Sequence, residues 1–195
     1  MNITDRLLML THPGDSSKTV RLDILARAVL PVYEKRIQEE KVQLVLELSD
    51  TTHVAADESL LKSVLSSLID NALDSLFGRP VRTLHVRTGS ESGGSYFEVE
   101  DSGCGIPERN LHKLFMPFYS AKGEWAPTDS PQTRLKGVGL SLAVSSMAVS
   151  NYGGRIEVRS IEGVGSTFRV VLPVHGIGQE DADRAPREVD QNYTE

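Results

Sequence analysis

A carboxylate at the end of an apolar strand is the residue best suited to recognise a ligand. In the segment Tyr96–Asp101 side chains alternate between faces, so Phe97, Val99 and Asp101 share one face. A carboxylate on an apolar face is costly unless it is paired. Such a group can accept a hydrogen bond from the exocyclic amine of adenine, whereas guanine presents an oxygen there and would be repelled. The alternative is that Asp101 merely caps the turn that follows it.

Glycines follow this carboxylate directly. Gly103 and Gly105 lie in the run Asp-Ser-Gly-Cys-Gly-Ile that ends at Ile106, and glycine permits both a tight turn and close approach of a ligand to the backbone. Cys104 is the only cysteine in the chain, which excludes an internal disulfide and a cysteine-based metal site. We expect this run to form one wall of a nucleotide pocket.

Polar side chains border the apolar stripe of a helix that is predicted over 57–77. Ser63, Ser67, Asn71 and Asp74 follow one another at helical spacing, so they lie along one edge of the stripe. Asn71 can offer its side-chain oxygen to Mg²⁺, which prefers oxygen ligands and keeps waters and substrate phosphates. The alternative is a solvated helix edge that binds nothing.

A third element, the run Lys136-Gly137-Val138-Gly139-Leu140, opens a later helix. Backbone amides at a helix start form an anion site when glycines let phosphate approach. The run follows a loop and lacks a further glycine, so it is not a dinucleotide-binding fingerprint. It also lacks the Gly-Lys-Ser/Thr ending of a P-loop.

Periodicity predicts the elements that must position these groups. An amphipathic helix is predicted from Arg21 to about Gln43, with an interruption at Pro31. Its expected buried stripe is Leu22, Leu25, Ala26, Val29, Val32 and Ile37. Further helices are predicted over 57–77, 107–114 and 140–152, and strands over 42–48, from 54, and over 81–88, 96–101, 155–160 and 166–172. The Gly/Ser-rich stretch 89–95 predicts a loose hairpin loop.

These elements predict an α/β two-layer sandwich, in which helices pack on one face of a mixed sheet. The stretch 120–136 has no apolar period, and such a long connection within a domain is typical of a functional lid. We expect residues 1–20 to be the end of an upstream helical hairpin with a linker, 21–175 to be the domain, and 176–195 to be a disordered tail.

Composition excludes several classes of function. The 195-residue chain has a formal net charge of −6, which argues against non-specific nucleic-acid binding. No stretch approaches the roughly 20 apolar residues that span a bilayer, and residues 1–10 do not have the pattern of a signal peptide. We therefore expect a cytoplasmic fragment with no nucleic-acid or membrane contact of its own, within a parent protein that could be membrane-anchored.

The order and spacing of these motifs resemble the box series of the histidine-kinase, gyrase, chaperone and mismatch-repair ATPase superfamily. The series comprises Asn71, the run 101–106, Leu114–Tyr119, Gly137–Leu140 and Gly163–Phe168. The phenylalanine-containing run and the ending Gly-Ser-Thr-Phe-Arg-Val-Val-Leu-Pro look specifically like the histidine-kinase branch. The resemblance covers about residues 21–174 and implies a Bergerat-type ATP-binding fold.

The resemblance implies roles for individual residues. By similarity, Asn71 would bind the Mg²⁺ that bridges the ATP phosphates, and Asp101 would read the adenine amine. Ile106 would pack on the base, Lys122 would meet the terminal phosphate, and Thr167 would lie near the adenine pocket. The full implied ATP-binding set is Asn71, Asp101, Gly103, Gly105, Ile106, Phe118, Lys122, Lys136, Gly137, Val138, Gly139, Leu140 and Thr167.

Two aromatic residues and one basic residue each allow a second interpretation that involves no ligand. Phe115 and Phe118 would anchor the base of the lid, with plain core packing as the other interpretation. For Lys122 the other interpretation is a solvated surface charge.

Three features depart from the family pattern. Ser67 stands four residues before the magnesium asparagine, where relatives have Asn or a Glu general base, so efficient ATP hydrolysis by this chain is not expected. Asp74 stands where many kinases have Lys or Arg, which removes a phosphate contact and adds negative charge. No histidine has the sequence context of a phosphoacceptor.

The implied function is that of the ATP-binding kinase domain of a two-component sensor histidine kinase. It would donate the γ-phosphoryl of ATP to a histidine on a separate dimerisation domain, expected upstream in a parent protein. ATP and Mg²⁺ are the implied ligands, and that domain and a response regulator are the implied partners. We expect the isolated chain to bind ATP without phosphorylating itself. The alternatives are an ATPase or serine kinase on the same fold, and a degenerate ATP-binding scaffold.

Overall fold

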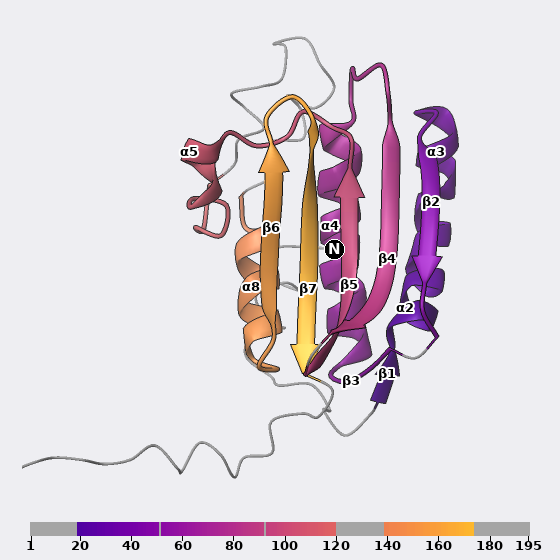
Figure 1. Cartoon of the computed structure of the whole chain (residues 1–195), viewed down its shortest axis with the longest axis vertical. Helices are drawn as coiled ribbons and strands as arrows, with labels where there is room; N and C mark the ends of the chain where they lie inside the picture. The colour runs from indigo at the N-terminus through magenta and orange to yellow at the C-terminus, as the bar shows by residue number, and fades with distance from the viewer. Residues whose placement is uncertain (1–18, 51, 92, 120–138, 174–195) are drawn as a thin grey trace, which may run out of the picture.

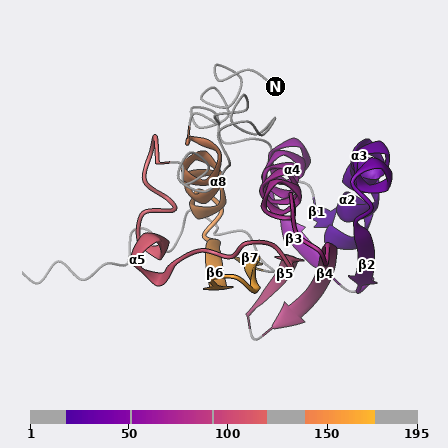
Figure 2. The same ribbon diagram turned by 90° about the horizontal axis from the view of Figure 1, so that it is seen from above.

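Two layers make up the part of the chain that the computed structural model describes, which comprises residues 19–50, 52–91, 93–119 and 139–173. The elements in chain order are β1 (Thr19–Arg21), α2 (Leu22–Val29), the 3₁₀ turn η1 (Leu30–Tyr33), α3 (Glu34–Glu39), β2 (Gln43–Leu48), β3 (His53–Ala55), α4 (Glu58–Ser75), β4 (Thr83–Glu91), β5 (Gly94–Asp101), α5 (Glu108–Leu111), α8 (Ser141–Ser150), β6 (Arg155–Ile161) and β7 (Gly165–Pro173). Figure 1 looks onto the sheet, and Figure 2 shows α2, α3, α4 and α8 together on one side of it. The predicted two-layer α/β sandwich is therefore confirmed.

The main sheet is mixed and has the order β2-β4-β5-β7-β6. Only β2 and β4 pair in parallel, and the other neighbours are antiparallel. A separate small sheet joins β1 to β3, so Thr19 and Val20 pair with Ala55 and Val54. Within the described residues, the domain thus includes two residues that the sequence suggested were linker. None of the described helices is long and apolar enough to cross a membrane.

The first helical stretch is broken where Pro31 was expected to interrupt it. Helix α2 ends at Val29 and a 3₁₀ turn over Leu30–Tyr33 separates it from α3. The tighter winding shifts the phase of the buried stripe. Leu30 and Tyr33 are consequently buried, while Val32, which was predicted to be buried, is 79% exposed.

The central helix α4 covers the middle of the sheet. It begins where predicted, because the Asp57 side chain accepts a hydrogen bond from the Leu60 N–H at 2.8 Å and so caps the helix. Its buried stripe packs against strand residues such as Phe97 and Val99. This packing fixes α4 over β5, the strand that ends at Asp101.

The hairpin between β4 and β5 is tighter than its composition predicted. Pairing continues to Glu91 opposite Gly94, so most of the Gly/Ser-rich stretch lies inside the strands. Position 89 of β4 requires glycine, because a Cβ there would lie only 2.6 Å from Cζ of the Tyr96 ring. A close-packing requirement, rather than a loop, explains this glycine.

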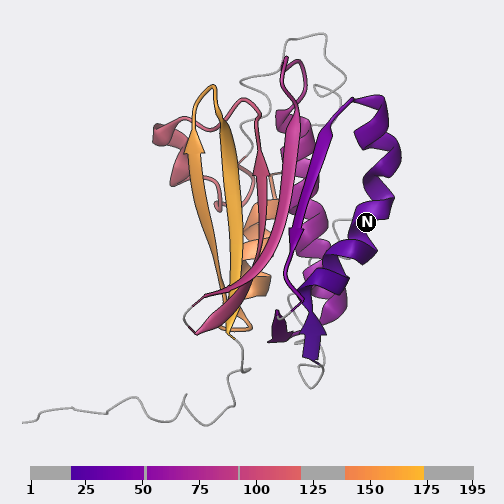
Figure 3. The same ribbon diagram turned by 45° about the vertical axis from the view of Figure 1, so that its right-hand side comes forward.

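The sheet face remote from the helices, which Figure 3 turns partly toward the viewer as a ribbon, carries a row of alternating charges that follows from the strand register. The row consists of Glu47, Arg87, Glu98, Arg169 and Glu157, which are successive register partners across the sheet. We call this set the charge row.

Glu98 stands at the centre of the charge row. It is 5% exposed and accepts hydrogen bonds from Arg87 at 3.0 Å and from Arg169 at 2.7 Å. The Arg169 guanidinium also stacks on the Tyr96 ring, 4.2 Å from its centroid. The buried charge of Glu98 is thus balanced by two guanidinium groups on the same face of the sheet.

Candidate functional site

Asp101 lies on the helix side of the sheet, as the strand alternation predicted. It is 5% exposed, and its Oδ1 accepts hydrogen bonds from the Ser75 hydroxyl at 2.7 Å and from the Gly103 N–H at 2.8 Å. Ser166 is the register partner of Asp101 on β7, and its backbone lies close enough to lower the pKa of the carboxyl. The side chain is therefore held in one orientation between α4, β7 and the turn that follows β5.

Burial is the main influence on the protonation of this carboxylate. Removal from water raises the pKa of Asp101 to about 6, against the opposing hydrogen bonds from Ser75 and Gly103 and the effect of the Ser166 backbone. The group is thus ionised at neutral pH and presents a buried hydrogen-bond acceptor.

The glycines after Asp101 are required by close packing. A Cβ on Gly103 would overlap the Ser75 hydroxyl and would lie 2.6 Å from Asp101 Oδ1. Gly105 has φ +66° and its Cβ would overlap the Ile161 carbonyl oxygen. The turn is tied to neighbouring elements by the Cys104 N–H, which donates to the Ser75 carbonyl, and by the Ile106 N–H, which donates to Ser160 Oγ at 2.8 Å. Ile106 itself is half-buried against the core.

Three polar residues of α4 form a row that starts at Asp101. Ser75, Asn71 and Ser67 follow at intervals of one helical turn, so they share a face of α4. Among the described residues, Ser67 Oγ and Asn71 Nδ2 are buried and have no hydrogen-bond partner. Unsatisfied buried polar atoms are rare in folded proteins, and a missing ligand or water is a common explanation.

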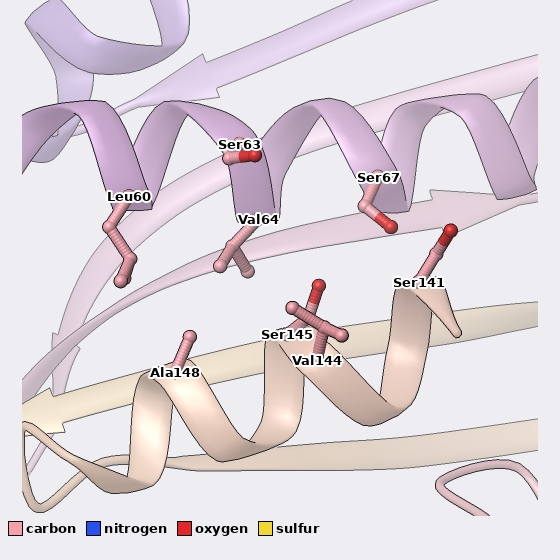
Figure 4. Close-up of a pocket in the computed structure, with 8 residues that line it drawn as sticks. All are labelled: Leu60, Ser63, Val64, Ser67, Ser141, Val144, Ser145 and Ala148. Atoms are coloured by element: carbon pink, nitrogen blue, oxygen red, sulfur yellow. The ribbon is translucent and has the colours of Figure 1, made fainter. Parts of the chain in front are cut away.

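The row leads into a groove between α4 and α8. Figure 4 shows Ser67 of α4 and Ser141 and Ser145 of α8 pointing into it. The groove is lined by Leu60, Ser63, Val64, Ser67, Ser141, Val144, Ser145 and Ala148. Its cavity of about 20 Å³ has room for one or two water molecules.

Gly139, just before α8, packs against the backbone of Phe118 and Tyr119. Gly139 has φ +69°, and a Cβ there would lie 2.5 Å from the Tyr119 carbonyl oxygen. Leu140 is the residue before the first turn of α8. The remaining predicted phosphate residues, Lys122, Lys136, Gly137 and Val138, lie outside the described residues.

The phenylalanine-containing run is only partly packed. Leu114 is buried and Phe115 is half-buried, whereas Phe118 is 73% exposed and has φ +67°. A bulky residue in the left-handed region is strained. Phe118 thus does not serve as a packed anchor among the described residues.

Among the described residues that were predicted to form the site, Thr167 lies on the face of the sheet opposite to Asp101. It pairs with Glu100, whereas its neighbour Ser166 pairs with Asp101. Since successive residues of a strand point to opposite faces, Thr167 faces away from the carboxylate and Ser166 lies beside it. Ser166, and not the predicted Thr167, is therefore the residue of this strand that lies beside Asp101.

Asp74 does not add an unpaired negative charge to the row on α4. Its carboxylate accepts a hydrogen bond from the Arg36 guanidinium of α3 at 2.8 Å, and Arg36 also pairs with Glu40 at 2.8 Å. The Arg36 and Asp74 side chains are 32% and 17% exposed. Asp74 therefore joins α3 to α4.

We expect Asp74→Ala to lower the free energy of unfolding by about 0.5–1 kcal/mol, the usual range for a partly exposed ion pair. ATP affinity should stay within about twofold of the wild-type value, because Arg36 already balances this charge. Chemical denaturation and calorimetric titration measure the two effects. Asp70→Ala is the matched control, since Asp70 lies 3.9 Å from the same guanidinium. A clear gain in ATP affinity in Asp74→Ala alone would contradict this assignment.

Ser75 is a site residue that sequence reasoning missed. It extends the row of Ser67 and Asn71 by one more turn, which periodicity could have shown. Nothing in the sequence indicated that it meets Asp101, because that contact depends on how α4 packs over β5.

Together these residues combine an ionised buried acceptor, a glycine turn and a row of buried polar atoms. The acceptor suits a ring amine, and the glycines leave room for a flat ligand beside the backbone. The carboxamide of Asn71 suits Mg²⁺, which takes one or two protein ligands together with substrate phosphates. This set of donors and acceptors suits an adenine nucleotide.

Known proteins resemble this chain in both sequence and structure. Residues 56–176 match the family described as "Histidine kinase-, DNA gyrase B-, and HSP90-like ATPase". The sensor histidine kinase ZraS of Escherichia coli is 34% identical over 176 residues, which cover 89% of this chain and 35% of ZraS. The signal transduction histidine-protein kinase AtoS of the same organism is 28% identical over 180 residues, which cover 91% of this chain and 28% of AtoS.

A solved structure has the same fold. The catalytic domain of the histidine kinase ThkA, in a nucleotide-free form, has a TM-score of 0.67 at 24% identity, with 81% of this chain and 97% of that chain covered. The chain spans about a third or less of the length of AtoS and ZraS. By the family match, the chain belongs to the histidine kinase-, DNA gyrase B- and HSP90-like ATPase family, and within this family it resembles the ATP-binding catalytic domains of sensor histidine kinases.

Proposed function

We propose that this chain binds Mg²⁺·ATP between α4 and the end of β5 and supplies the γ-phosphoryl group to a histidine on a separate dimerisation domain. The observation that carries the proposal is Asp101, an ionised carboxylate that is 5% exposed and oriented by two hydrogen bonds of 2.7 and 2.8 Å. A buried charge is costly, and a ligand amine would give it a further partner.

The described residues suggest how the nucleotide would lie. Asp101 would accept the adenine amine, and Gly103 and Gly105 would leave space for the base. The row along α4 would then run beside the ribose and phosphates, with Asn71 Nδ2 and Ser67 Oγ, which have no partner among the described residues, toward the phosphate end. The backbone at the start of α8 would face the phosphates, since a helix N-terminus attracts anions.

The metal would be held by the Asn71 side-chain oxygen and by the phosphates themselves. When bound, Mg²⁺ supplies neutralisation of the charge that develops in phosphoryl transfer. The chain's own residues would position the nucleotide, and in this chemistry positioning and charge neutralisation provide most of the rate enhancement.

Ser67 is the observation that supports a second candidate function, an ATP-binding scaffold that transfers no phosphoryl group. A serine hydroxyl with no base beside it is a poor general base, and the groove residues that surround Ser67 in Figure 4 are uncharged. This favours transfer to a reactive acceptor over hydrolysis, and it is also compatible with an ATP-binding module that transfers nothing. An ATPase or a serine kinase on the same fold is less favoured for the same reason.

Incubation with ATP labelled in the γ-phosphate tests the proposal. We expect the chain alone to acquire no label, and a separately prepared histidine-bearing hairpin domain from the same parent protein to become labelled only with the chain and Mg²⁺ present. Replacing the acceptor histidine by Gln is the control. Binding of ATP without label on the hairpin would favour the scaffold, and steady phosphate release would favour an ATPase.

The remaining assignments are proposals that follow from the same function. The partners would be the histidine-bearing domain and a response regulator; ThkA, for example, has been solved in complex with the response regulator TrrA. Residues 1–20 would belong to the connection with the helical hairpin, 21–175 would form the catalytic domain, and 176–195 would be a tail. The chain would act on the cytoplasmic side.

A further inference from the structure

The C-terminal turn of α4 is an unfavourable neighbour for a carboxylate. Unpaired carbonyls and the negative end of the helix dipole gather at this end. Asp101 nevertheless lies against it, because its Oδ1 is 2.7 Å from the hydroxyl of Ser75, the last residue of α4. A donor must therefore stand between the helix end and the carboxylate.

The Ser75 hydroxyl stands in that place. Its Oγ lies 2.7 Å from the Ala72 carbonyl oxygen and 2.7 Å from Asp101 Oδ1. A hydroxyl has one proton, so it cannot donate a full hydrogen bond to both oxygens at once. A hydrogen bond to an ionised acceptor is the stronger one, so the proton turns toward Asp101 when the carboxylate is charged.

The backbone of Ser75 fixes the turn that follows Asp101. The Cys104 N–H donates to the Ser75 carbonyl at 3.2 Å. The absence of a side chain on Gly103 leaves the Ser75 hydroxyl its space, since a Cβ would lie 2.7 Å from Ser75 Cβ. Ser75 thus contacts both the carboxylate and the glycine turn.

We propose that Ser75 is a positioning residue for adenine recognition, which orients the Asp101 carboxylate and keeps it ionised beside the end of α4. The inference rests on the proposed nucleotide function of Asp101. The donor role of Ser75 follows from its position at the end of α4, 2.7 Å from Asp101 Oδ1.

In the described part of the chain, few other groups influence the charge of Asp101. Its register partners Leu84 and Ser166 are uncharged. Among the described residues, the titratable groups near Asp101 are Glu100 on the same strand, the Cys104 thiol in the following turn, and Arg79, which acts on Cys104. The hydrogen bond from Ser75 favours the ionised form and is the largest of the effects that oppose burial.

The test compares Ser75→Ala with Ser66→Ala across a pH series. Ser66 lies on the same helix and is half-buried, so both substitutions bring the same gain in helix propensity. Calorimetric titration with Mg²⁺·ATP between pH 5 and 8 gives the affinity. The ligand's own ionisation is the same for every variant and cancels in the comparison. Carbon-13 NMR of the carboxyl groups without nucleotide gives the pKa of Asp101 directly.

We expect the wild-type affinity to fall below about pH 6 and Ser66→Ala to behave like wild type. In Ser75→Ala the midpoint should rise by about one pH unit, so that affinity at pH 6.5 is roughly threefold weaker than wild type. The NMR titration should show the same rise. Circular dichroism confirms that the helix is retained, as the better helix propensity of alanine leads one to expect.

The outcomes separate the two proposals. An unchanged midpoint and an unchanged carboxyl pKa in Ser75→Ala would overturn the role of Ser75, even where Asp101→Asn abolishes ATP binding. Normal ATP affinity in Asp101→Asn would overturn the nucleotide function of Asp101 and the role of Ser75 with it.

Discussion

Asp101→Asn is expected to weaken ATP binding by at least about a hundredfold while leaving the fold intact. The asparagine oxygen can still accept hydrogen bonds from Ser75 and Gly103, which both donate to Oδ1 in the wild type. Its NH₂ group, however, would replace the second carboxylate oxygen and oppose the adenine amine. A site that is built to accept a hydrogen bond discriminates strongly when the acceptor becomes a donor.

Isothermal titration with ATP measures the loss, and Glu100→Gln is the matched control. Glu100 is the neighbouring residue on the opposite face of β5, so the control removes one negative charge and leaves both hydrogen bonds of the Asp101 carboxylate in place. Its ATP affinity should remain within about twofold of wild type. Equal losses in the two variants would mean that net charge, rather than the Asp101 contact, governs binding.

Asp101→Asn should raise the free energy of unfolding, although it weakens ATP binding. The pKa of Asp101 is raised from 3.8 to about 6, so burial disfavours the ionised form of the folded protein. Between these pH values the folded state binds the proton that the unfolded state has lost, and this group's contribution to stability falls as pH rises through the window. Above about pH 6 the folded protein carries the full free-energy cost of the buried, ionised carboxylate.

Asp101→Asn removes that cost and should raise the free energy of unfolding at pH 7 by about 1–2 kcal/mol, since a shift of one unit is worth about 1.4 kcal/mol and part of it is offset by lost charge-assisted hydrogen bonds. Urea denaturation at pH 5 and pH 7 measures this. The gain should shrink toward pH 4. A loss of stability at pH 7 would show that the carboxylate is a structural requirement.

Arg87→Met is expected to destabilise the fold by about 2–3 kcal/mol, without an effect on ATP affinity in the folded protein. The substitution takes from Glu98, which is 5% exposed, one of its two guanidinium partners. Removing one member of a buried ion pair leaves a charge with too few partners, which is far more costly than removing both. Partial exposure of Arg87, whose side chain is 24% exposed, keeps the figure below the upper end of the usual range.

Chemical denaturation tests this expectation with two further variants. Arg159→Met changes an exposed arginine of the edge strand β6 and should alter stability by less than about 0.5 kcal/mol. The double variant Arg87→Met/Glu98→Met removes both charges and should recover more than half of the loss. If Arg87→Met behaves like Arg159→Met, the charge row does not stabilise the sheet.

Local patterns in the sequence predicted the elements and part of the site. Alternation in β5 placed Asp101 on the core side, and an aspartate at position 57 predicted the start of α4; both depend only on neighbours along the chain. Pro31 predicted a break because proline removes a backbone donor wherever it occurs. These features needed no knowledge of how the elements pack.

Features that depend on tertiary pairing could not be predicted. Thr167 was placed near the pocket by motif position, but the register against β5 puts Ser166 there instead. Val32 is exposed because the 3₁₀ turn after α2 changed the helical phase. The contact of Ser75 with Asp101 and the charge row across five strands arise only when distant segments are brought together.

Comparison of ATP with inosine triphosphate in one titration series tests the central claim most directly. The two nucleotides share the ribose and phosphates, and inosine carries an oxygen where adenine carries the amine that Asp101 is proposed to read. With Mg²⁺ at pH 7.5, we predict that ATP binds and that inosine triphosphate binds at least about a hundredfold more weakly. Equal affinity for the two nucleotides, or no binding of ATP, would contradict the assignment of Asp101 as the adenine-reading residue.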